Sequence, residues 1–542
     1  MKKLIIRVSC LCLVLIMGLS VLASCGKLFG NKTEESESVS DVTESESNNT
    51  DADSNTSEES QSDGNDEVNE NIEYLPERID YNGATFKIVH DLQGKKQYIA
   101  PVDGTSMAAD SLNTAFRDRN LMLQNYYNIK VEVIDIDKAY GVKDELDIAN
   151  LSGEDFADAI FSVAGSIMST AVSNGYVLDL NELTELNLEA SYYDQRIQEE
   201  YLIEGKLFCI EGDFGVHDEL RTHVIAVNKT IYDEFRYDET YGSPYELVRD
   251  YKWTLDLMLK MAKGTSDYAS LGANMTKDSQ WGIISESPFP YVVYLGTGSK
   301  LVETDHSGIL TTAFADEVKY GQAVEILSDC VDKIFKNPEI LIADSSGGVL
   351  SDTNYWTEAQ NMFTNGQALF YTGTLSNFVV YANMEDELGL LPVPLYVEGQ
   401  SEYYSWCSGM AHTPLLIPRT VEKNDHVERT ANIVEGMAYF SKYMSSSKLS
   451  VHDAFYDKLS TAKLCRTADD YAMLELIFAN KTYDIDYTLN LSGTCWKITT
   501  FAGTSNYSVP QFLESYRQKM TNTNPETNPI LKLTTAIWTY YP

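Results

Sequence analysis

The chain has 542 residues and carries 81 acidic against 41 basic side chains, a formal net charge of −40. This charge argues against nucleic acid as a partner, because phosphate contacts need a basic surface, and against a chain that lies flat on an anionic bilayer. The length is sufficient for large apolar cores and predicts two lobes or domains.

Residues 1–24 have the pattern of a secretory signal peptide. Three basic residues precede an apolar run, and small residues follow it. Residues 22–25, Leu-Ala-Ser-Cys, resemble the bacterial lipobox. The resemblance implies that Cys25 carries a diacylglycerol thioether, with acyl chains such as palmitate. It implies a lipoprotein that is anchored to the cell membrane at its extracellular face. A plain signal peptide and an uncleaved anchor helix are the alternative interpretations.

Residues 25–75 are predicted to be a lipidated cysteine followed by a disordered acidic linker. Within them, residues 31–73 contain fifteen Asp or Glu, one Lys and no aromatic residue. Such a segment cannot bury enough apolar surface to offset its chain entropy, and its like charges keep it extended. We therefore expect a spacer between the lipid surface and the folded part of the chain.

The five cysteines beyond the linker predict neither a disulfide framework nor a metal site. Their number is odd, no two are close in sequence, and no Cys/His spacing is typical of zinc. They are Cys209, Cys330, Cys407, Cys465 and Cys495. We expect no metal and no cofactor, and no second apolar stretch is long enough to predict a transmembrane helix.

From residue 85 onward the chain alternates strand and helix patterns. Strands are predicted at residues 85–89, 129–136 and 157–161, and helices at residues 111–127 and 142–151. This alternation is typical of a parallel sheet covered by helices. Ligands lie beyond the carboxyl ends of such strands. We therefore expect a site at the loops of residues 90–91, 162–165 and 211–213.

The rest of the chain continues as mixed strands and helices, which predicts an α/β fold class throughout. Further strands are predicted at residues 206–210, 223–227, 368–371 and 388–394. Further helices are predicted at residues 254–263, 318–335, 359–364, 428–444, 468–479 and 510–521.

Eight short patterns follow one another in this part of the chain. They are Asp158-Ala-Ile-Phe-Ser162, Val177-Leu-Asp-Leu-Asn-Glu-Leu183, Gly205-Lys-Leu-Phe-Cys-Ile210, Val227-Asn-Lys229, Trp253-Thr-Leu-Asp256, Gln280-Trp-Gly-Ile283, Met362-Phe-Thr-Asn-Gly-Gln-Ala368 and Leu388-Gly-Leu-Leu-Pro-Val-Pro394. With this order the chain resembles the extracellular solute-binding proteins of bacterial ABC importers, of the carbohydrate-type family.

The resemblance implies a type 2 periplasmic-binding-protein fold, in which two α/β lobes joined by a hinge enclose a central ligand cleft. Lobe 1 would hold residues 80–222 and 395–450, and lobe 2 residues 223–394 and 451–542. The resemblance also implies a monomer that is not an enzyme. It would capture a small solute, a carbohydrate or an oligosaccharide, by lobe closure and deliver it to the permease subunits of an ABC transporter.

Six side chains are candidates for ligand binding in the implied cleft. Sugars present apolar CH faces and hydroxyl groups, so a sugar site needs aromatic faces and polar side chains. Trp356, Trp406 and Trp496 are the candidate aromatic platforms, with a place in the core as the alternative for each. Ser162, Asp213 and Tyr371 follow predicted strand ends, where turn or capping roles are the alternative.

Two other functions stay open at this point. An exported carbohydrate-active enzyme would need two carboxylates about 5–10 Å apart, and no spacing of Asp or Glu singles out such a pair. A surface adhesion or sensor-accessory module would use the same fold to present a protein-binding face.

Overall fold

The structure is a computed structural model that describes residues 75–91, 111–136, 138, 141–344, 348–351, 353–377, 384–423, 425–444, 448–461, 464–504 and 506–542. Contacts divide the chain into Met1–Glu70 and Asn71–Pro542, and every described residue belongs to the second unit. The predicted signal peptide, Cys25 and nearly all of the predicted linker lie outside the described residues. None of the helices in the described part is both long and apolar enough to span a bilayer.

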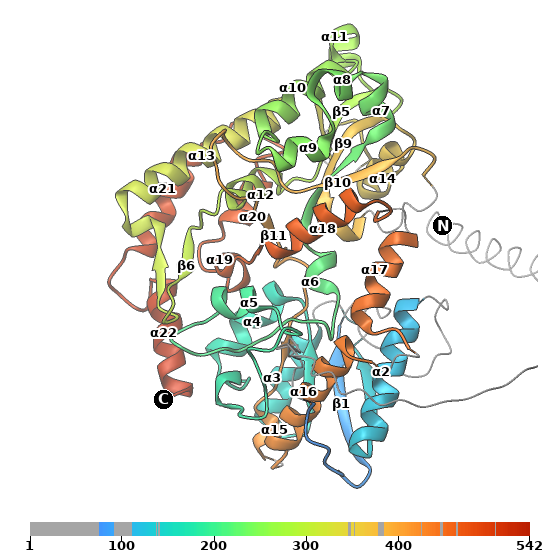
Figure 1. Cartoon of the computed structure of the whole chain (residues 1–542). Coiled ribbons are helices and arrows are strands. Elements are labelled where there is room, and N and C mark those ends of the chain that lie inside the picture. Colours follow the sequence, from blue (N-terminus) through green and yellow to red (C-terminus); the bar gives the residue numbers. More distant parts are fainter. Residues whose placement is uncertain are drawn as a thin grey trace, which may run out of the picture. The chain divides into compact units, whose positions relative to one another are not determined.

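The first sheet contains strands β1 (Ala84–His90), β2 (Ile129–Asp135), β3 (Ala159–Phe161) and β12 (Leu415–Leu416), in the order β12-β3-β1-β2. β1 pairs in parallel with β2 and β3, whereas β12 is antiparallel to β3. Around this sheet lie helices α2 (Ser111–Tyr127), α3 (Gly141–Ser152), α4 (Ala164–Ser173) and α16 (Val427–Lys442) (Figure 1). The predicted parallel sheet with covering helices is confirmed.

The second sheet contains β4 (His223–Asn228), β5 (Trp281–Ser285), β8 (Ile340–Ile342), β9 (Ala368–Thr374) and β10 (Leu388–Leu391), in the order β10-β4-β9-β5-β8. β5 is parallel to β8 and β9, and β4 is antiparallel to β9 and β10. Helix α10 (Leu255–Thr265) packs on this sheet and begins where the Thr254 side chain accepts a hydrogen bond from Leu257 N. Such an N-cap satisfies a backbone donor that has no partner within the helix.

Other helices surround these two sheets. They are α7 (Lys229–Glu234), α8 (Tyr237–Tyr241), α9 (Pro244–Arg249), α11 (Tyr268–Leu271), α12 (Phe289–Gly296), α13 (Glu317–Phe335), α14 (Tyr355–Thr364), α15 (Thr420–Lys423), α17 (Val451–Thr461), α18 (Ala468–Ala479), α20 (Thr494–Thr499), α21 (Val509–Met520) and α22 (Pro529–Tyr540). Short 3-10 turns are η2 (Leu180–Glu182), η3 (Gly272–Asn274), η4 (Ala313–Ala315) and η5 (Leu375–Asn377).

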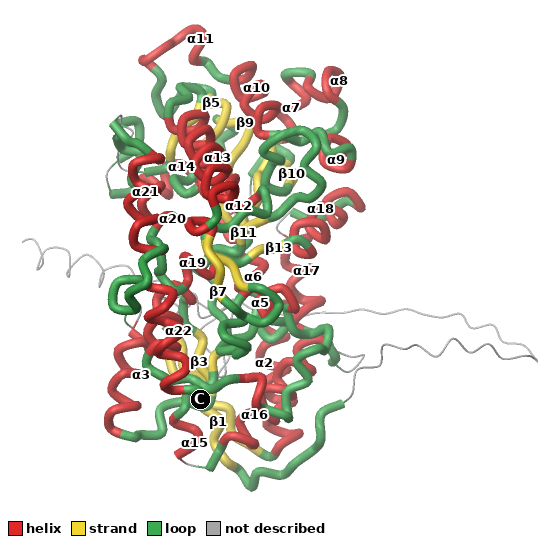
Figure 2. The backbone as a smooth tube through the Cα atoms, turned by 90° about the vertical axis from the view of Figure 1, so that its left-hand side faces the viewer, coloured by secondary structure: helices red, strands yellow, loops and turns green. Residues whose placement is uncertain are grey.

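Short elements connect the two sheets. Strand β11 (Ser405–Trp406) pairs in parallel with β13 (Lys481–Thr482), and Figure 2 shows this pair between the sheets. Helices α5 (Gln195–Glu200), α6 (His217–Leu220) and α19 (Ile485–Thr488) lie in the same region, with the hairpin of β6 (Val302–Thr304) and β7 (Leu310–Thr312). We call β11 and β13 the crossing strands.

Two helices of residues 451–542, which are predicted to belong to lobe 2, also pack on helices beside the first sheet. Helix α17 packs on α2 of the first lobe, because its apolar face, which includes Val451 and Phe455, meets Leu112 and Phe116. Helix α22 packs on α4, which also belongs to the first lobe. These contacts lie near the predicted lobe boundaries, which stay a prediction.

The strand predicted at residues 206–210 is wrong. This segment forms only isolated bridges, from Ile203 to Lys206 and from Ile210 to Leu415. Its consecutive apolar residues 207–210 are buried, but no neighbouring strand runs alongside for the whole length of the segment. The other predicted strands and helices are present, and α14 begins at Tyr355, earlier than the predicted residue 359.

Candidate functional site

Polar side chains gather where the strands of the second sheet end. Glu286 directly follows β5, Ser376 and Asn377 follow β9, and Arg221 lies just before β4, which runs in the opposite direction. Arg221 Nη1 donates to Ser376 Oγ at 2.8 Å, and the Asn377 amide donates to the Glu286 carboxylate. We call Arg221, Glu286, Ser376 and Asn377 the strand-end cluster. It lies at the carboxyl edge of the sheet, where ligands bind in open α/β folds.

The carboxyl group of Glu286 is held in a buried environment. Burial raises the pKa of Glu286 to about 7, although the hydrogen bond from Asn377 and the charge of Arg221 lower it. The group therefore exchanges between carboxylate and carboxylic acid near neutral pH, and it can accept a hydrogen bond from a hydroxyl group or donate one. A Cβ on Gly373 would lie 2.9 Å from Glu286 Oε1, so the glycine lets this carboxylate approach the strand backbone.

Two further polar residues end strands of the first sheet. Asp91 follows β1, Ser162 follows β3, and both side chains are almost completely buried. Asp91 Oδ2 accepts a hydrogen bond from Val142 N at 3.2 Å, and burial raises the pKa of its carboxyl group. Ser162 is thus at a strand end, as predicted, and its role as a ligand-binding residue stays a prediction.

The segment after β11 joins the two sets of strand ends. Ser408 N donates to Arg221 O at 2.9 Å, beside the strand-end cluster. One residue later, Gly409 O accepts from Gly165 N at 2.9 Å, in the first turn of α4, which follows Ser162 and Val163. Residues from both sheets are therefore brought to one region by a few consecutive residues of the crossing segment.

An aromatic column leads from this region to the surface. The Trp406 ring stacks on His223, with a centroid distance of 5.3 Å and an interplanar angle of 4°. Tyr487 lies 5.8 Å from Trp406 on one side and 5.7 Å from Trp496 on the other. Trp406 is completely buried, whereas Trp496 is 54% exposed. We call His223, Trp406, Tyr487 and Trp496 the aromatic column.

The aromatic column is in contact with the start of α4 and with the segment after β11. A Cβ on Gly165 would lie 2.7 Å from Tyr487 Cε1, and one on Gly409 would lie 2.7 Å from Tyr487 Cδ1. The buried indole N–H of Trp406 has no hydrogen-bond acceptor within the described part of the chain. Burial lowers the pKa of His223 to about 3, so this ring stacks on Trp406 in its neutral form.

Three of the predicted site residues, Tyr371, Asp213 and Trp356, belong to neither the strand-end cluster nor the aromatic column. β9 continues to Thr374, so Tyr371 lies inside the strand rather than at its end, and it is fully buried beside Phe363. Asp213 Oδ1 lies 2.9 Å from His452 Nδ1, and Asp213 Oδ2 lies 3.5 Å from Lys442 Nζ. Trp356 lies on α14 with 40% of its surface exposed.

Comparison with known proteins identifies the fold. No family model and no curated protein matches the chain in sequence. A solved cyclo/maltodextrin-binding protein in complex with maltotetraose matches with a TM-score of 0.51 and 10% identity, over 82% of this chain and 98% of that chain. A maltose-binding periplasmic protein from Listeria monocytogenes in complex with maltose has a TM-score of 0.49 and 14% identity, over 81% and 99%. The predicted two-lobed type 2 periplasmic-binding-protein fold is confirmed by the first of these.

Proposed function

We propose that this chain is a lipid-anchored extracellular solute-binding protein that captures a carbohydrate or oligosaccharide between its lobes and delivers it to the permease subunits of an ABC transporter. One observation carries the proposal. The strand-end cluster and the aromatic column converge where strands of both sheets end. A carboxyl, an amide and a guanidinium group suit sugar hydroxyls, and aromatic faces suit the CH faces of a sugar ring.

The carbohydrate class has support from the fold match. The cyclo/maltodextrin-binding protein that shares the fold was solved with maltotetraose. In this chain Trp496 offers an exposed indole face, and the neighbouring Tyr487 connects it to the buried Trp406. Trp496 is therefore the stacking residue we propose, with Glu286 and Asn377 as hydrogen-bonding partners of the sugar. Trp406 can contact a solute only through a movement that uncovers it.

Lobe closure is the proposed mechanism of capture. A solute that contacts residues of both lobes stabilises the closed arrangement relative to an open one, by its difference in affinity for the two. Glu286 and Asn377 follow strands of the second sheet, whereas Ser162 and Asp91 follow strands of the first. The lipid anchor on Cys25 and the acidic linker would keep this receptor close to a permease in the same membrane.

Thermal unfolding of the purified chain with maltotetraose tests the proposal. At 100 times its Kd a bound ligand adds about 2.7 kcal/mol to the free energy of unfolding, which raises the melting temperature. We expect Glu286→Gln and Trp496→Ala to reduce this shift, and Glu189→Gln, at an exposed position, to preserve it. No shift with maltotetraose or with other sugars would contradict the proposed carbohydrate receptor.

The purified chain and its variants also test the two other functions that the sequence leaves open. Release of a reducing sugar during the assay would support an exported carbohydrate-active enzyme. Capture of a partner protein that is independent of added sugar would support an adhesion or sensor-accessory module.

A further inference from the structure

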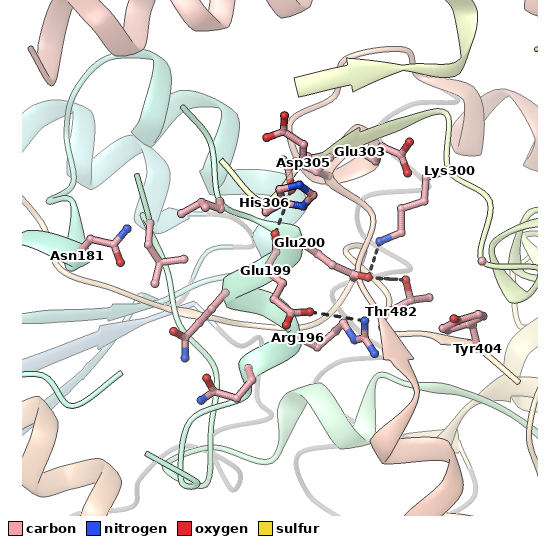
Figure 3. Close-up of a pocket in the computed structure, with 17 residues that line it drawn as sticks. Asn181, Arg196, Glu199, Glu200, Lys300, Glu303, Asp305, His306, Tyr404 and Thr482 are labelled. Carbon is pink, nitrogen blue, oxygen red and sulfur yellow. Dashed lines mark hydrogen bonds and ion pairs between the residues drawn. The ribbon is translucent and has the colours of Figure 1, made fainter. Parts of the chain in front are cut away.

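A groove of about 740 Å³ lies between α5 and the β6–β7 hairpin, and Figure 3 shows the side chains that face it. This volume is within the range of sites that bind small molecules, about 300–1,000 Å³. The groove is lined by Asn181, Gln195, Arg196, Gln198, Glu199, Glu200, Leu202, Leu207, Gly298, Lys300, Glu303, Thr304, Asp305, His306, Tyr404, Thr482 and Ile485. None of these residues belongs to the strand-end cluster or the aromatic column.

The walls of the groove come from both lobes and are fixed to each other. Lys300 Nζ lies 2.7 Å from Glu200 Oε1, and Thr482 Oγ1 of a crossing strand donates to the same carboxylate at 3.2 Å. At the far end Thr304 Oγ1 donates to Glu199 O at 3.0 Å. The hairpin turn is held there too, because Glu204 N donates to Gly308 O at 2.7 Å. The groove is therefore formed before any ligand arrives.

The charged groups of the lining already have partners. Arg196 pairs with Glu199 at 3.7 Å, and Glu303 pairs with Lys319 outside the groove. The Asp305 carboxylate accepts hydrogen bonds from two backbone N–H groups of its own turn. Four acids line the groove and its two basic side chains, Arg196 and Lys300, already face carboxylates, so an anionic ligand would meet repulsion. The lining has few apolar side chains, which argues against an apolar ligand.

We propose that this groove is a second binding site, for a neutral hydroxyl-rich solute of oligosaccharide size. The amide oxygens of Gln195 and Gln198 and the outer oxygens of the paired carboxylates supply acceptors for the hydroxyl groups of such a ligand, and the Tyr404 hydroxyl group can accept or donate. The amide nitrogens of both glutamines already donate to backbone carbonyls, which fixes the direction of these side chains. Since both lobes form the walls, an occupied groove would favour the lobe arrangement seen in this structure. Binding here does not require a ligand at the strand-end cluster.

Hydrogen–deuterium exchange of the whole chain with maltotriose as the probe tests the second site. We expect slower exchange in peptides that cover residues 195–207 and 298–306, by about 100-fold at 100 times Kd where exchange requires ligand release. His306 is exposed on the hairpin turn, so His306→Trp fills the groove and should abolish this protection. Glu398→Trp places the same indole on an exposed loop and should preserve it.

Glu286→Gln separates this site from the strand-end cluster. Protection of the groove peptides should persist in this variant, even where peptides of residues 281–289 and 371–377 no longer respond. Groove protection that disappears in Glu286→Gln would mean that lobe closure at the strand-end cluster causes it, and would overturn the second site. Unchanged groove peptides at every soluble concentration of maltotriose would also overturn it, as would protection by spermidine alone.

Discussion

Lys481→Met should destabilise the protein more than any exposed lysine substitution, because the Lys481 ammonium group is buried among carboxylates. Its Nζ lies 2.7 Å from Asp194 Oδ2 and 3.4 Å from Glu219 Oε1, and it also contacts the Asp218 carboxylate. The exposed fraction is 7% for the Lys481 side chain and 1% for that of Asp218. Burial alone would lower the pKa of Lys481, but the charges of Asp194 and Asp218 raise it well above its usual value.

The size of the stability loss in Lys481→Met follows from the buried carboxylate that is left without a partner. Methionine keeps the unbranched stem and removes the ammonium group, which leaves Asp218 buried without its cation. Breaking a buried ion pair in this way costs about 3–5 kcal/mol. Burial already raises the pKa of Asp218 well above its usual value, so the variant can protonate this carboxyl at low pH. We therefore expect a larger loss of stability at pH 8 than at pH 5.

Urea unfolding followed by tryptophan fluorescence measures this loss. The midpoint should fall while the slope stays constant, because the surface exposed on unfolding does not change. Lys252→Met is the matched control, since the Lys252 side chain is 65% exposed and pairs with Asp250 at 2.8 Å. An exposed pair of this kind contributes about 0–1 kcal/mol. Equal losses in the two variants would refute the reasoning that burial makes the Lys481 contacts strong.

Three further predictions concern the site and the anchor. Burial raises the pKa of Glu286 from 4.5 to about 7, so the folded protein binds a proton at this carboxyl group more tightly than the unfolded chain does. The free energy of unfolding should therefore fall by up to about 3 kcal/mol as the pH rises from 4 to 8. Urea titrations of Glu286→Gln should lack this decrease. Gly165→Ala pushes a methyl group against Tyr487 and should cost about 1–3 kcal/mol by calorimetry, whereas Gly215→Ala, whose Cβ has 4.0 Å of space, should cost less. Cys25→Ala should move the protein from the membrane fraction to the soluble fraction on cell fractionation, and continued sedimentation with membranes would exclude the acyl anchor.

The spacing of apolar residues predicts most helices and strands of this fold, because each element depends mainly on the sequence pattern within it. Residues 111–127 carry an apolar stripe at helical spacing, and α2 has the same bounds. The strand predicted at residues 206–210 is wrong because a short apolar run indicates burial but not strand pairing, and these residues are buried without a neighbouring strand along their length. The strand predicted at residues 368–371 ends too early, since β9 continues to Thr374. The polar Thr372 and Thr374 suggest a strand end, yet both are buried within β9.

The candidate site is only partly visible in the sequence. Ser162 follows from the rule that ligands bind at carboxyl ends of strands. Glu286 lies at such an end as well, but its surroundings carry no recognisable motif, and its role depends on a hydrogen bond to Asn377, 91 residues later. Trp406 and Trp496 are predicted from residue type together with the family resemblance, since Trp406 follows the double-proline segment and Trp496 is a late aromatic residue. Tyr487, which joins them, belongs to a short helix whose position depends on long-range packing.

The crossing strands connect the stability of the protein to its candidate site. In the parallel register Ser405 lies opposite Lys481, and Trp406 lies opposite Thr482. One strand pair therefore holds both the buried ammonium group and the central ring of the aromatic column. A substitution that loosens β13 should also displace Trp406, so Lys481→Met should weaken maltotetraose binding although Lys481 belongs to neither the strand-end cluster nor the aromatic column. Unchanged affinity in a folded Lys481→Met variant would show that the two sides of this strand pair act independently.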